Sequence, residues 1–168
     1  MHCGNAHCSS GNTKTTVDNS GNVGYDNSIA IGADGMPIIS TYEFGTALQV
    51  VHCTAVDCSS SDAPRPVDSS ADVGKYSSIT IGADGLPVIS YQDFSNGTLK
   101  VLHCGSLDCS SGNTSTTVDA SPFAGAFTSI TIGADGLPLI SSFEGGDVDN
   151  LKVLHCANTF CVPYFRRR

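Results

Sequence analysis

The chain has 168 residues, of which 40% are hydrophobic and only 14% are charged. This length is enough for one domain with its own core, and the composition excludes a disordered polyampholyte. Acidic residues outnumber basic residues 16 to 8, so the net charge is −8 and nucleic acid is not expected as a partner. No apolar run approaches the roughly 20 residues of a membrane-spanning helix, so we expect no membrane insertion.

One phrase is repeated along the chain. "SITIGADGLPVIS" at 78–90 occurs twice more with small changes, as "SIAIGADGMPIIS" and "SITIGADGLPLIS". The aspartate of its "GADG" segment recurs in steps of 50 and 51 residues, at Asp34, Asp84 and Asp135. A period near 50 built from short strands is typical of β-propeller blades. We divide this single repeat domain into a partial unit, 1–23, and three repeats, 24–73, 74–124 and 125–168.

Each repeat is expected to contain four antiparallel strands. In the middle repeat, "SITIG" at 78–82 leads through an Asp-Gly turn into a second strand at 88–91. The third strand is "LKVLHC" at 99–104, and the fourth runs through the Thr-rich "NTSTTVD". Helical apolar spacing is absent, so we predict an all-β fold, a β-propeller-like array of four-stranded antiparallel blades. The alternative is a β-trefoil, which also has three four-stranded repeats.

The eight cysteines follow the same period of about 50 residues, in four pairs with four residues between the partners. The pairs are Cys3/Cys8, Cys53/Cys58, Cys104/Cys109 and Cys156/Cys161. A four-residue hairpin loop places its flanking residues about 4.5–5.5 Å apart, within disulfide range. We therefore predict four local disulfides and a secreted or cell-surface protein, extracellular or periplasmic.

A metal site is the alternative for these cysteines, because His and Cys are zinc ligands. Familiar zinc sites use closer Cys pairs, however, and the adjacent His and Cys of each "HC" pair point to opposite faces of a strand. We expect no metal and no cofactor.

The run "SITIGADGLPVISYQDFSNGTLKVLHCGSLDCSSGN" at 78–113 resembles the repeats of bacterial secreted β-propeller proteins. The resemblance rests on the DG turn, "PVISY", the "NG" turn and "LKVLHC", and it covers nearly the whole chain. The same run is also loosely similar to the Asp-box hairpin of sialidase-like propellers. What the resemblance implies is a scaffold more than an activity.

The two ends of the sequence complement each other. The N-terminus keeps only "HC" of a third strand and a fourth strand through Asp18, whereas the C-terminal "LKVLHC" precedes a divergent fourth segment. Three blades are fewer than the about four to eight that usually close a propeller. We therefore expect the chain to be its own partner, with Leu151–Cys156 pairing with a neighbour's N-terminal strand in a six-bladed ring or a head-to-tail filament. The Arg166–Arg168 tail is a candidate contact for an acidic neighbour.

Candidate ligand-binding residues follow the second strand of each repeat. They are the aromatic Tyr42, Tyr91 and Phe143, which we take as equivalent, the acidic Glu43, Asp93 and Glu144, and Phe44 and Phe94 just beyond. Aromatic rings beside polar groups are typical of glycan sites in propeller lectins, so a carbohydrate-binding lectin is an alternative function. Packing between blades explains the same rings.

A sialidase-like glycoside hydrolase is a further alternative. That chemistry uses an arginine cluster, and apart from its last three residues the chain has only Arg65. Glu43 and Glu144 could form a carboxylate pair, but a solvated rim explains them. We therefore predict no enzyme and no catalytic residue, but a non-catalytic secreted scaffold or binding module that self-assembles by strand complementation. Asn96-Gly-Thr and Asn113-Thr-Ser match the glycan acceptor pattern.

Overall fold

The structure is a computed structural model that describes residues 1–146 and 149–162, so the Arg166–Arg168 tail lies outside the described residues. Within those ranges the chain forms eleven strands and no helix. The strands are β1 (Tyr25–Ile31), β2 (Pro37–Glu43), β3 (Ala47–His52), β4 (Arg65–Asp68), β5 (Val73–Ile81), β6 (Pro87–Asp93), β7 (Thr98–His103), β8 (Thr114–Asp119), β9 (Ala126–Ile132), β10 (Pro138–Glu144) and β11 (Asn150–His155).

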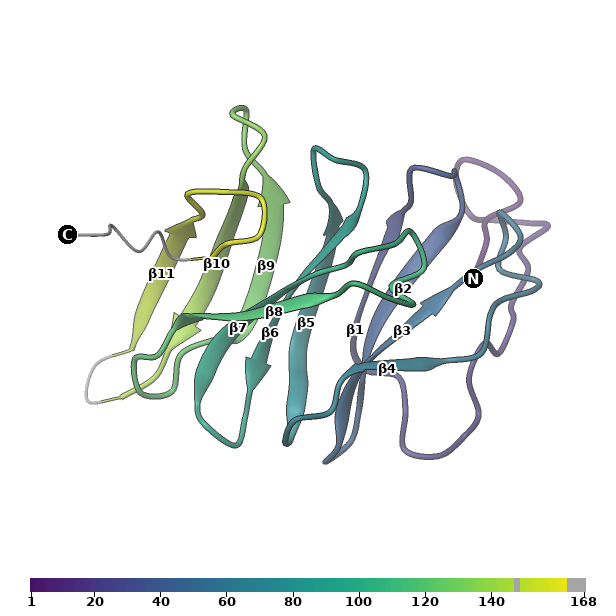
Figure 1. Ribbon diagram of the computed structural model, residues 1–168. Coiled ribbons are helices and arrows are strands. Elements are labelled where there is room, and N and C mark those ends of the chain that lie inside the picture. Colours follow the sequence, from purple (N-terminus) through teal and green to yellow (C-terminus); the bar gives the residue numbers. More distant parts are fainter. Residues whose placement is uncertain (147–148, 163–168) are drawn as a thin grey trace.

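Three antiparallel sheets stand side by side (Figure 1). Their strand orders follow the chain: β1-β2-β3-β4 is blade 1, β5-β6-β7-β8 is blade 2, and β9-β10-β11 is the described part of blade 3. The first strand of each blade lies beside the first strand of the next, β1 against β5 and β5 against β9. This stacking of antiparallel meanders confirms the predicted all-β, β-propeller-like fold class over the trefoil alternative.

The Asp-Gly turn between first and second strands has the predicted form. In blade 2, Gly85 has a φ of 82°, a left-handed conformation that glycine adopts without steric cost. The Asp84 Oδ1 atom accepts a hydrogen bond from the backbone N–H of Leu86 at 3.1 Å. Pro87 then begins β6, where its missing N–H is tolerated. The turn chemistry therefore explains why the phrase is conserved among the three repeats of this chain.

A bulge interrupts the first strand of each blade. It contains Asp26, Tyr76 and Phe127, whose φ values are 45°, 55° and 52°. The pairing register with the second strand shifts at these points. Two of the bulges are fastened to the following blade, because the carbonyl of Asp26 accepts a hydrogen bond from Ser77 and that of Tyr76 accepts one from Thr128. Bulges of this kind re-aim side chains at one end of a strand.

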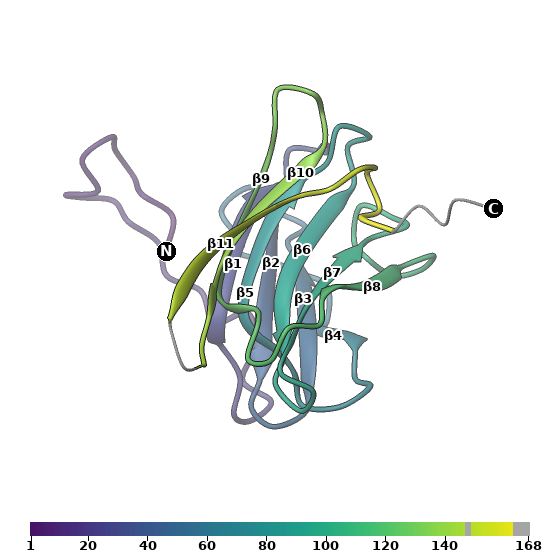
Figure 2. The same cartoon turned by 90° about the vertical axis from the view of Figure 1, so that its left-hand side faces the viewer.

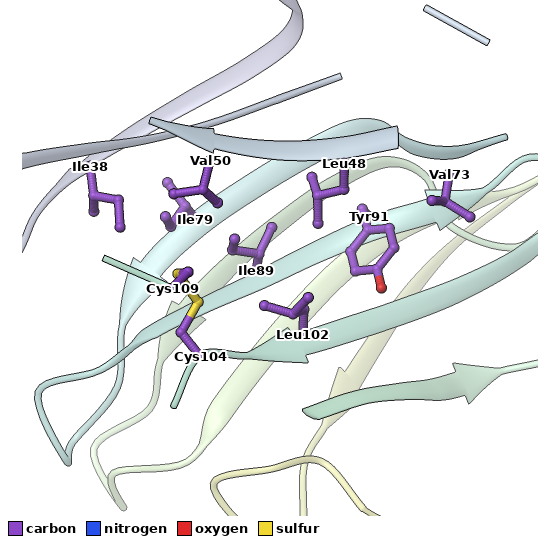
Figure 3. Close-up of a cluster of buried hydrophobic side chains, with 10 residues drawn as sticks. All are labelled: Ile38, Leu48, Val50, Val73, Ile79, Ile89, Tyr91, Leu102, Cys104 and Cys109. Atoms are coloured by element: carbon purple, nitrogen blue, oxygen red, sulfur yellow. A yellow bond between two sulfur atoms is a disulfide. The ribbon is translucent and has the colours of Figure 1, made fainter. Parts of the chain in front are cut away.

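The core lies between the blades. Figure 3 shows Ile38, Leu48 and Val50 of blade 1 facing side chains of blade 2 such as Ile79 and Ile89. Burying an aliphatic side chain of this size contributes about 1.5–3 kcal/mol, so these contacts hold neighbouring blades together. The cluster between blades 2 and 3 uses the equivalent residues Val88, Leu99, Val101, Ala124, Ile130, Ile140, Cys156 and Cys161.

All four predicted disulfides are present. Their Cα–Cα distances are 4.7, 5.1, 4.9 and 4.8 Å, in chain order. The second cysteine of each pair has a positive φ of 49–54°, which closes the hairpin loop tightly enough for the bond. No helix in the described part of the chain is long and apolar enough to cross a membrane.

Candidate functional site

The end of the blades at which the first strands begin carries a row of aromatic side chains. Ring contacts link Tyr25 to Phe44 at 5.5 Å between centroids, Tyr76 to Phe127 at 4.4 Å, and Phe127 to Phe143 at 6.1 Å. These residues come from the bulges of the first strands and from the ends of the second strands, which pair with them. The repeated hairpin therefore brings aromatic residues from all three blades to the same end.

An open groove lies at this end between blades 2 and 3. Its volume is about 570 Å³, and its lining consists of Tyr76, Gln92, Phe94, Phe123, Ala126, Phe127, Phe143, Gly145 and Gly146. Phe94, Phe123 and Phe127 are 54–67% exposed, so their rings face solvent and not a core. We call this hollow the aromatic groove. Its size falls in the range of small-ligand sites, which are mostly apolar and contain a few polar groups.

Three of the groove's aromatic residues have positive φ values: Tyr76 at 55°, Phe123 at 59° and Phe127 at 52°. A bulky residue in this region of the backbone map costs of the order of 1–3 kcal/mol. Such strain persists where the surrounding structure imposes it, and it clusters at binding and catalytic sites. Positive φ values also occur at Asp26 and in the disulfide hairpins, so the exposed rings of Phe94, Phe123 and Phe127 mark the aromatic groove as the leading candidate site.

Tyr42, a predicted ligand-binding residue, is buried. Its hydroxyl donates a hydrogen bond to Asp72 Oδ1 at 2.5 Å and accepts one from the backbone N–H of Gly45 at 2.7 Å. Burial, together with the hydrogen bond to Asp72, raises the pKa of Tyr42 to about 12. The Tyr42 ring cannot stack on a ligand, and among the aromatic residues near it Phe44 is exposed instead.

Tyr91 is not equivalent to Tyr42 and Phe143, which corrects the sequence alignment of the repeats. Tyr42 pairs with Leu48 and Phe143 with Leu151, whereas the partner at that register in blade 2, Leu99, pairs with Gln92. Neighbouring residues on a strand face opposite sides, so Tyr91 lies on the other face of its sheet. There it is buried and its hydroxyl contacts Asp68 Oδ2 at 2.6 Å.

The three predicted acidic residues each have a partner within the protein. Glu43 accepts a hydrogen bond from Gln49 Nε2 at 2.8 Å. Asp93 is buried and accepts bonds from the backbone and side-chain nitrogens of Asn96 at 3.0 and 2.9 Å. Glu144 forms an ion pair with Lys152. None of the three lines the aromatic groove, whereas Phe143 does.

The glycan acceptor predictions fall on two turns. Asn96 is exposed, but its side-chain nitrogen donates to Asp93. Asn113 donates to the carbonyl of Cys109 at 2.9 Å and accepts from the backbone N–H of Gly105 at 3.1 Å, so it closes the disulfide hairpin. Glycosylation at either position stays a prediction.

An ion-pair network at the "VD" aspartates links successive blades. Lys100 of blade 2 lies 2.5 Å from Asp68 of blade 1, and Lys152 of blade 3 lies 3.0 Å from Asp119 of blade 2. Burial disfavours ionised Asp68, but hydrogen bonds from Lys100, Tyr91 and Ser70 outweigh that cost and hold its pKa at about 2. Sequence reasoning missed this contact, although the repeated aspartate and lysine signalled it.

The hydroxyl of Tyr42 is hydrogen-bonded to one carboxylate and lies in the field of a second. Asp72 is hydrogen-bonded to it, and the negative charge of Asp26, which is exposed in the bulge of blade 1, also raises its pKa. The ammonium of Lys75 lies 3.7 Å from Asp72 and 3.1 Å from the ring centroid of Phe94. Among the described residues, no group of three or more His, Cys, Asp or Glu side chains could hold a metal ion.

Sequence reasoning also missed Phe123 and Phe127. The signal lay in a break of the repeat, since "SPFAGAFTS" replaces the polar "SADVGKYSS" of the preceding repeat. Two phenylalanines in a segment that is otherwise rich in small residues are difficult to explain by packing. The structure places both in the groove.

Solved structures of glycosidases resemble this fold. The alpha-L-arabinofuranosidase from Lactobacillus brevis is 12% identical, with a TM-score of 0.61 over 81% of this chain and 50% of that one. An alpha-L-arabinofuranosidase from Clostridium thermocellum is 9% identical, with a TM-score of 0.56 over 80% and 47% of the two chains. An engineered glycoside hydrolase with endo-xylanase and exo-arabinofuranosidase activity is 14% identical, with a TM-score of 0.57 over 78% and 26%.

The chain thus spans half or less of the length of these structures, and at such identities the likeness establishes the fold alone. No protein-family model matches the sequence, and no curated protein sequence does. The comparisons contradict the prediction that the chain is no enzyme, because the similar structures are glycosidases. They do not support a non-catalytic scaffold either. The prediction relied on the shortage of arginines for one sialidase-like mechanism, and that shortage has no bearing on other glycoside hydrolases.

Proposed function

We propose that the chain is a secreted, carbohydrate-active protein that binds a saccharide in the aromatic groove. The observation that carries the proposal is the set of exposed rings in one open groove: Phe94, Phe123 and Phe127 line it and are 54–67% exposed. Aromatic faces provide a flat apolar surface that matches the C–H face of a sugar ring. The four disulfides support a location in an oxidising compartment, outside the cytoplasm.

Pentose polysaccharides are the first ligands to test. The similar structures include two arabinofuranosidases and an enzyme with endo-xylanase activity, so arabinan and arabinoxylan follow from the likeness in fold. Gln92 in the groove has its amide nitrogen committed to the carbonyl of Ala124 at 3.0 Å, which leaves its carbonyl oxygen as the acceptor for a sugar hydroxyl.

Affinity electrophoresis and calorimetry with arabinan and arabinoxylan test the proposal. We expect binding to at least one polysaccharide, and Phe127→Ala is expected to weaken it by about tenfold or more, because one stacked ring contributes of the order of 1.4 kcal/mol. Phe160→Ala is the matched control, because Phe160 is also exposed but lies against His103 in the disulfide hairpin region. Equal affinities of Phe127→Ala and the wild type, or no binding at all, would contradict the proposal.

Glycoside hydrolysis is a second candidate, favoured by Asp26 and Asp72. Hydrolysis of a glycosidic bond uses two carboxyl groups on either side of that bond. Asp72 is hydrogen-bonded to the hydroxyl of Tyr42, and the negative charge of Asp26 contributes to the raised pKa of that hydroxyl. Release of nitrophenol from an aryl arabinofuranoside should be measurable for the wild type and lost in Asp26→Asn and Asp72→Asn. Asp57→Asn, in an exposed hairpin, is the control, and turnover that survives in both site variants would exclude this carboxylate pair.

A further inference from the structure

The two interfaces inside the chain are copies of one another. One side of each interface, which we call the front face, consists of Ile38, Leu48 and Val50 in blade 1 and of Val88, Leu99 and Val101 in blade 2. All six side chains are buried by the following blade. The other side, the back face, includes Ile79 of blade 2 and Ile130 of blade 3, which are 6% and 7% exposed.

The front face of blade 3 repeats this surface, and no other described part of the chain covers it. Leu151 and Val153 stand where Leu48 and Val50 stand in blade 1, by their pairing with Phe143 and Ser141. Their exposed fractions are 81% and 65%, against 0% and 1% for the residues of blade 1. Figure 2 looks onto this face, and within residues 1–146 and 149–162 no further sheet lies in front of β9, β10 and β11. The same aliphatic residues therefore occur a third time on an open surface.

The back face of blade 1 is open as well. Ile29 corresponds to Ile79 and Ile130, yet it is 60% exposed, and its neighbour Ile31 is 61% exposed. Two apolar hollows of about 330 and 300 Å³ lie between this face and the N-terminal segment, since Thr15, Val17 and Ile39 line both of them. The chain thus presents a front face at one end and a matching back face at the other.

A glycine shows how closely the two faces fit. A Cβ atom added to Gly74 would lie 2.7 Å from the Cα of Leu48, and one added to Gly125 would lie 2.9 Å from that of Leu99. Each leucine of the front face therefore packs on the bare backbone of a glycine in the next blade. The corresponding Gly24 has a similar φ of 84° but nothing within 4 Å of the position of a Cβ. Gly24 therefore leaves an open packing position for a leucine that is equivalent to Leu48 and Leu99, such as Leu151.

Polar contacts repeat in the same way. Ser40 meets Ser77 of the next blade at 2.9 Å, and Ser90 meets Thr128 at 2.7 Å. Ser141 of blade 3 is equivalent to Ser40 and Ser90. The residue equivalent to Ser77 and Thr128 is Asn27, on the back face of blade 1, so the next pair in the series would join Ser141 to the Asn27 of another blade 1.

We propose that a second copy of the chain docks head to tail, with the front face of blade 3 on the back face of blade 1 of its neighbour. The occupant is a second copy because the docking surface continues the interface that the chain already forms twice. Leu151 of one copy packs on the backbone of Gly24 of the other copy, and Val153 covers Ile29 of that copy. Two copies joined at both ends make a closed ring of six blades, and unclosed repetition makes a filament.

Sedimentation velocity or light scattering at micromolar concentration tests the proposal, with Leu151→Glu and Ile29→Glu as variants. Both residues are exposed in the single chain, so a charge there does not disturb the fold, and circular dichroism verifies this. We expect a dimer or larger assembly for the wild type and a monomer for each variant. Leu107→Glu, the same change at a residue that is 39% exposed in the hairpin of blade 2, should leave the assembly intact. A monomeric wild type, or an assembly that both variants retain, would overturn the proposal.

Salt and cross-linking separate docking from nonspecific association. The net charge of −8 makes two copies repel, so added salt should strengthen an association that is built on apolar contacts. The double variant Asn27→Cys and Ser141→Cys should form a disulfide between chains under mild oxidation, since all native cysteines in the described residues are already paired. Absence of that cross-link in an assembled sample would contradict the head-to-tail geometry.

Discussion

His103 Nε2 lies 2.8 Å from Asp84 Oδ2, and the His103 side chain is only 2% exposed. The same contact recurs between His52 and Asp34 and between His155 and Asp135, each at 2.8 Å. It joins the two most regular motifs of the sequence, "HC" and "GADG". In each blade the contact holds the turn after the first strand against the end of the third strand. The two repeated motifs therefore form one structural His–Asp contact and not a catalytic site.

Removal of this His–Asp contact should lower the free energy of unfolding most in blade 2. We expect His103→Ala to lower the free energy of unfolding by about 2 kcal/mol, because a buried hydrogen bond to a charged group contributes about 1.5–3 kcal/mol. His155→Ala, at a side chain that is half exposed, should cost less than about 1 kcal/mol. Urea denaturation of both variants measures the difference. Equal losses would show that burial does not set the strength of the contact.

Acid should destabilise the protein in a defined window. The pKa values of Asp34, Asp119 and Asp135 are lowered, and that of Asp68 is about 2, against 3.8 in the unfolded chain. Carboxylates with depressed pKa values stabilise the folded state fully above pH 3.8 and lose that contribution as the pH falls toward 2. The melting temperature should therefore be flat near neutrality and drop below about pH 4.

The variant Asp68→Asn isolates one of these groups. It should melt at a lower temperature at neutral pH and show a shallower decline on acidification, because it lacks the carboxylate that pairs with Lys100. A decline as steep as that of the wild type would indicate that Asp68 makes no contribution.

A lysine is missing from one of three equivalent places. Gln49 occupies the register position of Lys100 and Lys152, as its pairing with Thr41 shows. Here Asp18 Oδ2 and Gln49 Oε1 are buried and have no hydrogen-bond partner in the described part of the chain. Gln49→Lys should give Asp18 the cation that Asp68 has and raise the free energy of unfolding by about 1 kcal/mol. Thermal unfolding measures the gain, and Lys100→Gln, the reverse change, should cause a loss.

The disulfides should differ in their resistance to reduction. Cys104 and Cys109 are 0% and 1% exposed, whereas Cys8 is exposed. A soluble thiol reaches only exposed sulfur atoms, so Cys3–Cys8 should be reduced first and Cys104–Cys109 only on unfolding. Alkylation followed by mass spectrometry gives the order. Reduction of all pairs at one rate in the native state would contradict it.

The sequence was sufficient for the features that are local. Asp-Gly turns, a period of about 50 residues and cysteines five positions apart are all set by neighbouring residues, so they predicted the hairpins, the repeated blades and the disulfides. Errors arose where side chains alternate between two faces. A shift of one residue put Tyr91 with Tyr42 in the repeat alignment, and only strand pairing assigns that place to Gln92.

Features that depend on contacts between blades required the tertiary structure. The aromatic groove joins residues of blades 2 and 3, so no single repeat shows it. Burial likewise differs between identical residues: Leu48 and Leu151 follow the same pattern, yet one is covered by the next blade and the other is 81% exposed. Sequence by itself determined what each blade is made of, because turns and disulfides depend on local chemistry. The packing of one blade on another decided which of its surfaces are core and which remain open to a ligand or a partner.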